Sequence, residues 1–351
     1  MTIRSIPPAL VLLAITAAAQ QPPKPSFSQP ALHPSRPEIV FVSGGDIWTA
    51  PLAGGEAQLL ISHPAEELRP LWSPDGRQLA FVSLRTGGGD IYVLDVAASN
   101  LRRLTFSDAL DSLDAWSPDS QWIYFHSSRP VQLTDIYRVR TTGGTPLEVS
   151  ADTMMTEFFA APSPDGSQVV FSARGIAWNQ WWRNGHSHLD ESEIWRMNLA
   201  GAPSYERLVA KMGKNLWPMW GAGAQLFFVS DRTGAENLFT LEKGAPRQLT
   251  RFQDGRLLFP SIGQNGATIV FERNFAIWRY DIKSGKASPI EITLRGAPAL
   301  PTDARQPVTS FNSMELSPDG KKLALIARGE IFVAASKEGD ALAVTRTPAV
   351  E

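Results

Sequence analysis

The chain has 351 residues, of which 43% are hydrophobic and only 19% charged, and its formal net charge at pH 7 is −2. This near-neutral balance argues against general nucleic-acid binding, which usually needs a basic surface. The absence of cysteine excludes disulfides, thiolate metal sites and a lipid-modified cysteine.

The first predicted element is an export signal. Arg4 precedes an apolar run from Ile6 to Ala17, and the small residues Ala17 to Ala19 offer a cleavage site before Gln20. A basic start, a short apolar stretch and small residues at the cut are typical of a secretory signal peptide. We therefore expect residues 1–19 to be removed and the mature protein to be periplasmic or secreted. No later segment is long and apolar enough to span a bilayer.

The rest of the chain repeats one phrase seven times. In the clearest copy, two apolar stretches flank Pro74-Asp75-Gly76, and two further short strands follow, Asp90-Ile-Tyr-Val and Leu101-Arg-Arg-Leu-Thr. Proline fixes φ, aspartate caps the turn and glycine takes a positive φ, so the centre predicts a hairpin. Four-stranded repeats of about 40–45 residues are typical of a β-propeller. The sequence therefore predicts an all-β propeller.

The copies are in phase with one another. The predicted third strand of each copy supplies one aromatic residue: Trp48, Tyr92, Tyr137, Trp195, Phe239, Trp278 and Phe332. The second strands are nearly continuous apolar runs, as expected for strands buried on both faces. The fifth copy, around Trp220 to Phe228, is one residue shorter and lacks the Pro-Asp-Gly turn, so we expect an irregular blade there.

The spacing between copies predicts the domain organisation. The distance from each third-strand aromatic to the position equivalent to Phe81 in the next second strand is 33, 33, 34, 33 and 32 residues in turn, but it is 47 from Trp278 to Leu325. We interpret residues 20–290 as a propeller of six four-stranded blades, 291–308 as a linker and 309–351 as the first blade of a second, truncated propeller. The alternative is a single seven-bladed propeller with one long loop.

The fourth copy carries an insertion between its second and third strands. Phe171 and Trp195 are 24 residues apart, whereas Phe81 and Tyr92 are 11 apart. The candidate binding residues of this insertion are Trp181, Trp182, Arg183, His186, His188 and Asp190. An extended chain would place the two histidines and the aspartate on one face, as a divalent metal requires. The other interpretations are local packing on the ring and a protein contact, since Trp and Arg are enriched at interface hot spots. We predict a contact surface anchored by the two tryptophans and the arginine, and no metal.

A second group of charged residues recurs in the predicted first strands. Three residues before the equivalent positions Pro70, Asp114 and Ala160 lie Glu67, Asp111 and Glu157, and Lys214 lies in the matching region of the fifth copy. The innermost strand of each blade lines the central channel, so these residues are predicted at its mouth, where they could face a cationic or peptide ligand. The alternative is that they are solvated turn charges paired with Arg69 and its neighbours. The recurring Arg85, Arg129 and Arg232 are interpreted as staples between blades that pair with Asp90 and Asp135.

The sequence contains no G-x-S-x-G elbow, P-loop, H-E-x-x-H or dinucleotide fingerprint. We therefore expect no catalysis by this chain and no cofactor.

The repeat W-S-P-D-G-x-x-[IL]-A-F, followed by [DE]-I-[YW] and L-T, resembles that of the TolB-like propellers. Within that group the chain resembles in particular the N-terminal part of the tricorn-type proteases. The residues that carry this closer resemblance are Gln180 to Arg183 with Gly185 to Trp195, and Leu316 to Ala324 with Ala327 to Phe332. The resemblance covers about residues 27–351.

Tricorn-type enzymes carry a six-bladed and a seven-bladed propeller ahead of a PDZ domain and a serine-protease core, and the propellers are thought to gate peptide traffic. The resemblance therefore implies a non-catalytic module for peptide or protein binding, or for substrate gating, without the catalytic Ser or His. The implied partners are peptides or protein domains, downstream protease domains or a second copy, with no nucleic acid and no membrane span. The alternative function is a self-contained periplasmic TolB-like propeller that binds proteins.

Overall fold

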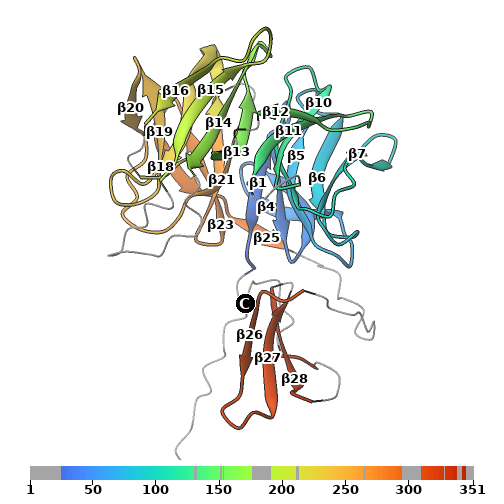
Figure 1. Cartoon of the computed structure of the whole chain (residues 1–351). Coiled ribbons are helices and arrows are strands. Elements are labelled where there is room, and N and C mark those ends of the chain that lie inside the picture. The colour runs from blue at the N-terminus through green and yellow to red at the C-terminus, as the bar shows by residue number, and fades with distance from the viewer. Residues whose placement is uncertain are drawn as a thin grey trace, which may run out of the picture.

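The computed structural model describes residues 25–129, 133–150, 152, 154–175, 191–210, 213–263, 266–294, 310–327, 329–337 and 342–344. These residues form seven sheets, each built on four antiparallel strands that follow one another along the chain. Figure 1 shows the first six sheets gathered into one body and β26–β28 as a separate sheet. Among the residues that the structure describes, no helix could span a bilayer.

The first three blades begin near the N-terminus of the described chain. The first has β1 (Ser28–Leu32), β2 (Glu38–Ser43), β3 (Asp46–Pro51) and β4 (Gly55–Ile61). The second has β5 (Glu67–Trp72), β6 (Gln78–Ser83), β7 (Asp90–Asp95) and β8 (Asn100–Arg103). The third has β9 (Asp111–Trp116), β10 (Trp122–Ser127), β11 (Asp135–Arg140) and β12 (Leu147–Ser150).

The remaining blades continue the same pattern. The fourth has β13 (Met155–Pro162), β14 (Gln168–Gly175), β15 (Glu193–Asn198) and β16 (Tyr205–Val209). The fifth has β17 (Asn215–Trp220), the one-turn 3-10 helix η2 (Ala222–Ala224), β18 (Leu226–Ser230), β19 (Asn237–Glu242) and β20 (Ala245–Gln248). The sixth has β21 (Leu258–Ile262), β22 (Thr268–Arg273), β23 (Ala276–Asp281) and β24 (Lys286–Pro289). The seventh sheet has β26 (Ser313–Leu316), β27 (Lys322–Ala327), β28 (Glu330–Ala335) and β29 (Leu342–Ala343).

The Ser-Pro-Asp-Gly turns form as their chemistry predicts. The Ser73 hydroxyl donates to Asp75 Oδ1 at 2.6 Å, and the same carboxylate accepts the Arg77 backbone N–H at 3.1 Å. Gly76 has φ +71°, which an L side chain rarely adopts. The irregular fifth blade replaces this turn with η2, whose Gly223 also has a positive φ of 65°. The hairpin between the first two strands therefore depends on local chemistry.

The core lies between the blades and repeats with them. Phe81 of β6 faces Tyr92 of β7 across the strand pair, with ring centroids 6.0 Å apart. The equivalent second-strand phenylalanines are at most 1% exposed: Phe41, Phe81, Phe125, Phe171, Phe228 and Phe271. In each blade of the ring this phenylalanine is buried and the third-strand aromatic is buried or half-buried, so the sequence repeat is also the packing repeat.

The first and sixth blades pack directly on each other. One buried cluster joins Phe41 and Trp48 of the first blade to Val270 and Ile277 of the sixth. The six blades therefore close a ring without the seventh sheet between them, as the six-bladed interpretation requires. The expected linker 291–308 begins differently from its prediction, because β25 (Ile292–Leu294) forms a fifth strand of the first sheet, parallel to β4.

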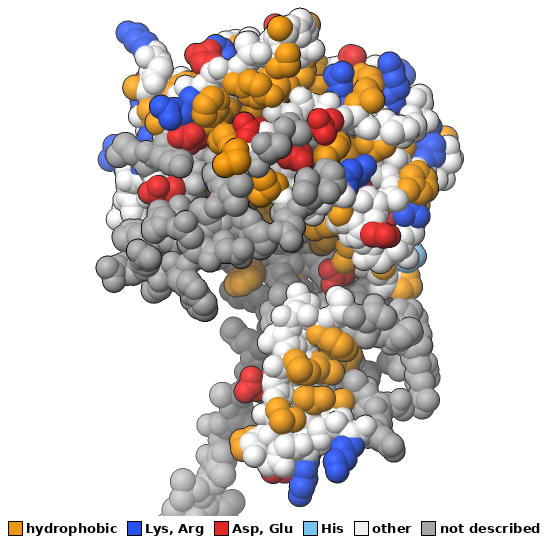
Figure 2. All heavy atoms as spheres, in the orientation of Figure 1, with side chains coloured by type: hydrophobic (Ala, Val, Ile, Leu, Met, Phe, Trp, Pro, Cys, Tyr) orange, Lys and Arg blue, Asp and Glu red, His pale blue; other side chains and the backbone are white. Residues whose placement is uncertain are grey.

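The seventh sheet leaves much of its apolar surface uncovered. Phe311, Met314, Leu316 and Val344 are between 48% and 63% exposed. Figure 2 shows hydrophobic side chains gathered on this sheet. The proposed boundaries at residues 1–19 and within 295–308 fall outside the described residues, so they stay predictions.

Candidate ligand-binding rim

The ring has two rims with different chemistry. We call the rim where the first strands begin the entry rim; its loops precede each first strand and join each second strand to the third. The opposite turn rim holds the Ser-Pro-Asp-Gly turns and the turns between third and fourth strands. Among the described propeller loops, the exposed large apolar side chains all lie at the entry rim: Phe106, Leu110, Met154 and Phe275.

At the entry rim a buried polar residue recurs at the start of the first strand. In three blades it accepts a hydrogen bond from an arginine that lies two residues after the second strand, and we call this residue and its arginine the clip. In the second blade, Glu67 is fully buried and accepts a 2.7 Å bond from Arg85 Nη2, while Arg85 Nε donates to Ser83 Oγ, also at 2.7 Å. Burial raises the pKa of Glu67, and the hydrogen bond and charge of Arg85 oppose that rise. The guanidinium also lies over the Tyr92 ring at 4.8 Å.

The third and fifth blades repeat the clip. Arg129 Nη2 donates to Asp111 Oδ2 at 2.5 Å and Arg232 Nη2 donates to Asn215 Oδ1 at 2.5 Å. The prediction that these arginines staple neighbouring blades by pairing with Asp90 and Asp135 is wrong. Each binds the first strand of its own blade, because the second strand runs beside the first and ends where the first begins.

The four residues predicted at the channel mouth divide into two groups. Glu67, Asp111 and Glu157 occupy equivalent positions, but each is at most 1% exposed. Lys214 is not their equivalent: the strand register places Asn215 there, opposite Ser230, and Lys214 Nζ instead reaches Glu236 at 3.3 Å. The first hairpin of the fifth blade is one residue shorter, so the equivalent position falls on Asn215, next to Lys214. Whether these groups meet a ligand stays a prediction.

The fourth blade has the clip carboxyl without the clip arginine. Glu157 pairs with Ala173 as Glu67 pairs with Ser83, and two residues later Gly175 takes the register position of Arg85. Glu157 Oε1 accepts a 2.8 Å bond from the Ser150 hydroxyl, and its Oε2 is buried with no partner. Burial raises the pKa of Glu157 to about 7.

The neighbouring edge of the third blade is also acidic. In the second and fourth blades a fourth-strand arginine pairs with the acid that opens the third strand, as Arg103 does with Asp90 at 2.8 Å. In the third blade the position equivalent to Arg103 is Glu148, which lies opposite Tyr137. Burial, together with the charges of Glu148 and Asp152, raises the pKa of Asp135 to about 6. We call the group Asp135, Glu148, Asp152 and Glu157 the acidic cluster.

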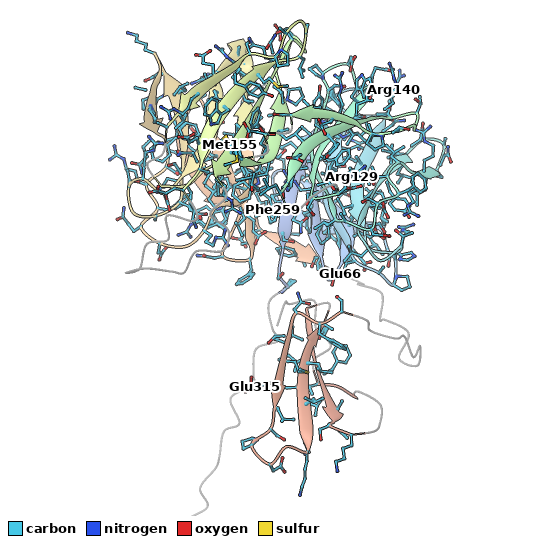
Figure 3. The ribbon with its side chains drawn as sticks, in the orientation of Figure 1. Glu66, Arg129, Arg140, Met155, Phe259 and Glu315 are labelled. Carbon is cyan, nitrogen blue, oxygen red and sulfur yellow. The ribbon has the colours of Figure 1, made fainter. Side chains whose placement is uncertain are left out.

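The propeller axis is filled by one residue from each first strand, which we call the axial cluster: Gln29, Arg69, Leu113, Phe159, Trp217 and Phe259. Phe159 stacks on Trp217 with ring centroids 4.6 Å apart, and Trp217 contacts Phe259 at 5.8 Å. The Arg69 guanidinium lies over the Phe259 ring at 5.4 Å and donates through Nε to the Leu113 carbonyl at 3.3 Å. Figure 3 labels Phe259 among these side chains and Arg129 of the third blade.

A strained backbone accompanies the axial cluster. Five of its six members have a left-handed φ between 48° and 59°, each at a β-bulge: Gln29, Arg69, Phe159, Trp217 and Phe259. Burial lowers the pKa of Arg69 to about 10, and the nearby Asp114 opposes this shift. Asp114 in turn contacts His126 Nδ1 at 2.7 Å and accepts the Ala160 backbone N–H at 3.0 Å. The described side chains therefore meet across the axis rather than leaving it open.

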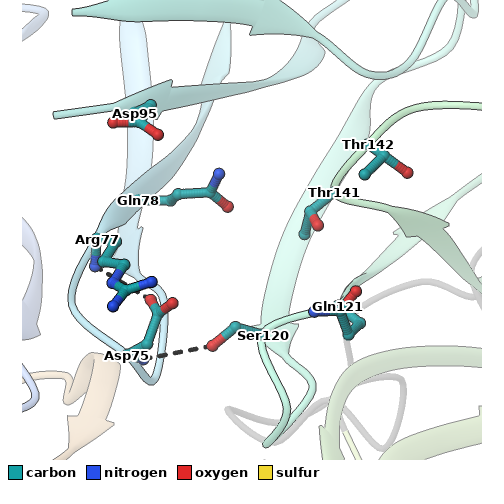
Figure 4. A pocket seen from close by; sticks show the side chains of 8 residues that line it. All are labelled: Asp75, Arg77, Gln78, Asp95, Ser120, Gln121, Thr141 and Thr142. Carbon is teal, nitrogen blue, oxygen red and sulfur yellow. Dashed lines mark hydrogen bonds between the residues drawn. The ribbon is translucent and has the colours of Figure 1, made fainter. Parts of the chain in front are cut away.

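The turn rim holds a polar recess. This recess of about 250 Å³ lies between the second and third blades, and the side chains that line it are polar. Figure 4 shows its lining, in which the Asp75 backbone N–H donates to Ser120 Oγ at 3.3 Å across the two blades. The recess thus joins two structural turns.

The insertion residues Trp181, Trp182, Arg183, His186, His188 and Asp190 lie outside the described residues. Their segment leaves β14 and returns to β15 at the entry rim, since both strand ends are there. Within the described part of the chain, no group of three or more His, Asp or Glu side chains could hold a metal ion.

The fold and its rims define a β-propeller. Residues 25–286 match the family described as the tricorn protease N-terminal beta propeller domain, and the chain belongs to that family. The resemblance drawn from the repeat is therefore confirmed. The chain is 26% identical over 330 residues to a tricorn protease homologue from Saccharolobus solfataricus, covering 89% of this chain and 29% of that protein.

Other comparisons give the same fold. A second tricorn protease homologue, from Streptomyces coelicolor, is 25% identical over 337 residues, covering 91% of this chain and 28% of that protein. The crystal structure of the tricorn protease superposes with a TM-score of 0.62 at 19% identity, over 92% of this chain and 32% of that one. TolB from Acinetobacter baumannii gives 0.50 at 15% identity, over 87% and 77%. The chain thus spans less than a third of its curated relatives.

Proposed function

We propose that this chain is a non-catalytic propeller module that binds peptide or protein segments at its entry rim, as part of a tricorn-type proteolytic system. The observation that carries the proposal is the asymmetry of the two rims. Phe106, Met154 and Phe275 are 65–72% exposed in entry-rim loops, close in the chain to buried acids, whereas the described turn-rim loops expose no large apolar side chain. Exposed apolar side chains beside polar groups are typical of protein contact surfaces.

Binding is favoured over passage through the ring. The axial cluster brings Arg69, Trp217 and Phe259 together on the axis, so gating would require these side chains to move apart. The insertion anchors Trp181, Trp182 and Arg183, proposed from sequence, belong to a segment that starts and ends at the same rim. Partners at that rim would be peptides, downstream protease domains or a second copy of the chain.

The second candidate is a self-contained TolB-like binding propeller. The match to 77% of the Acinetobacter baumannii TolB chain supports it, because the two chains are of similar size. Both candidates include export directed by the N-terminal signal. Purification of the mature protein from the periplasm or medium should yield an N-terminus at Gln20; an intact Met1 would contradict export.

The test compares two sets of exposed apolar residues on the purified chain. The entry-rim variant replaces Phe106, Leu110, Met154 and Phe275 with serine, and the control replaces Leu59 and Leu101, which are 38% and 39% exposed on β4 and β8. Binding of an unstructured peptide library should be lost in the first and kept in the second, and mass spectrometry should show the peptides uncleaved. Equal binding by both variants would contradict an entry-rim site, and peptide cleavage would contradict a non-catalytic module.

A further inference from the structure

In three blades a guanidinium occupies the same place, between the carboxyl or amide of the clip and the aromatic pair of the middle strands. Its distances from the third-strand ring are 4.8 Å for Arg85 on Tyr92, 5.1 Å for Arg129 on Tyr137 and 5.4 Å for Arg232 on Phe239. A planar guanidinium suits this place because it can stack on an aromatic ring and donate to a carboxylate at the same time.

The fourth blade has the carboxyl and the aromatic pair that surround the guanidinium in the other blades, but it lacks the arginine. Phe171 and Trp195 face each other across β14 and β15 as Phe81 and Tyr92 do across β6 and β7. Glu157 is 1% exposed, and its Oε2 has no hydrogen-bond partner. Glu67 Oε2 and Asp111 Oδ1 also have none, but the other oxygen of each pairs with an arginine, whereas that of Glu157 accepts only the Ser150 hydroxyl. Such a buried, unpartnered carboxylate oxygen is costly, so a donor that reached it would be strongly favoured.

Neighbouring cations serve other groups. The Arg174 guanidinium lies over the Phe158 ring at 5.3 Å, and Arg207 Nη1 pairs with Glu193 at 3.1 Å. Among the described residues, no guanidinium lies within cation–π distance of Phe171 or Trp195, and only Ser150 donates to Glu157.

The first and sixth blades show how the ring otherwise avoids this problem. The position of Glu67 is taken there by Phe27 and Leu257, which are 7% and 0% exposed, so neither blade buries a carboxyl at that point. In the sixth blade Arg273 covers Trp278 at 5.5 Å and pairs with Asp254. Within the described ring, the fourth blade is therefore the one that has a clip carboxylate and no cation.

We propose that Glu157, Phe171 and Trp195 form a binding site for the guanidinium of an arginine side chain supplied by a peptide or partner protein. This inference rests on the proposed function and names the chemistry that the entry rim selects. Asp135, Glu148 and Asp152 add negative charge beside the site and favour a cationic ligand. A guanidinium is preferred to an ammonium because the three equivalent sites are built for its flat, forked shape.

The experiment uses the purified chain and two acetylated, amidated peptides, Gly-Ser-Gly-Arg-Gly-Ser and the same peptide with citrulline in place of arginine. Citrulline keeps the shape of arginine and removes its charge. Calorimetry at pH 8 keeps Glu157 ionised, because its pKa lies at about 7. The arginine peptide should bind about tenfold more tightly than the citrulline peptide, as expected for a charge-assisted bond.

Two variants and one matched control test the residue assignment. Glu157→Gln should abolish the tenfold preference, whereas the matched change Glu67→Gln in the second blade should keep it. Gly175→Arg supplies an internal guanidinium and should also abolish the preference, with the fold checked by circular dichroism.

Equal binding of the arginine and citrulline peptides, or an unchanged preference in Glu157→Gln, would overturn the inference. A third peptide, with lysine in place of arginine, should bind more weakly than the arginine peptide, and equal binding of the two would overturn the guanidinium specificity. If peptides still require the apolar entry-rim residues but ignore arginine, the proposed function stands and only this site is wrong. If the preference for the arginine peptide persists in the entry-rim serine variant, this site stands and the exposed apolar residues are not the binding surface that the proposed function names.

Discussion

The second and fourth blades share a register and an aromatic pair, yet they treat the same buried carboxyl differently. In the second blade Arg85 neutralises Glu67 within the blade, and the pair acts as part of the core. In the fourth blade Gly175 stands at that register position, and Glu157 is held by one hydroxyl. A buried carboxyl paired within its own blade is a structural element, whereas one without a cation can serve a ligand.

The largest effect should be the same in both blades. Phe81→Ala and Phe171→Ala each remove a side chain that is at most 1% exposed, so each should lower the free energy of unfolding by about 3–5 kcal/mol. Urea denaturation measures this loss. A loss below about 1 kcal/mol in only one of the two would show that the blades are not equivalent in their cores.

The next effect should separate the blades. Arg85→Ala leaves Glu67 buried without its cation and should cost about 3 kcal/mol at pH 7, by analogy with other broken buried pairs. The control Arg251→Ala removes an exposed arginine and should cost almost nothing. Comparable losses in these two variants would show that the clip does not stabilise the second blade.

The fourth blade should show a stronger pH dependence than the second blade, where the hydrogen bond and charge of Arg85 oppose the rise in the pKa of Glu67. Burial raises the pKa of Glu157 from 4.5 to about 7, so the folded protein keeps this proton longer than the unfolded chain does. The associated stability is present below pH 4.5 and is lost as the pH rises through 7. Asp135, with its pKa raised to about 6, acts in the same direction.

Glu157→Gln should therefore raise stability at pH 8 by an amount on the order of 2–3 kcal/mol and change it little at pH 5. Thermal melts of wild type and variant across pH 5–8 give the comparison. Parallel curves for the two proteins would contradict an unpaired Glu157.

The smallest effect should be similar in the two blades, because both turns use the same serine-to-aspartate hydrogen bond. Asp75→Ala and Asp165→Ala each remove the carboxylate that accepts a serine hydroxyl, at 2.6 Å in both blades. Each should lower the melting temperature by about 2–4 °C. Unequal losses of melting temperature would show that the turns contribute to the difference between the two blades.

Much of the fold was predictable because its signals are local. The Pro-Asp-Gly turns, the apolar second strands and the third-strand aromatics each depend on residues close in sequence, and they form as predicted. The candidate site was predicted less well. The in-phase Glu67, Asp111 and Glu157 were found, but their burial and the partners of Arg85 and Arg129 were not, because charges in a repeat have several neighbours at similar distances.

The sequence by itself thus determined the strand repeat and the aromatic core, because turn chemistry and period-two burial act within a few residues, but it left a six-bladed and a seven-bladed ring as alternatives. Only the tertiary structure decided which acid each arginine binds, that the axial residues meet across the ring, and that β25 joins the first sheet. These outcomes depend on groups brought together from distant parts of the chain. The sequence has Gly175 where the second blade has Arg85, but only the strand register shows that the two positions are equivalent and that Glu157 therefore lacks an arginine.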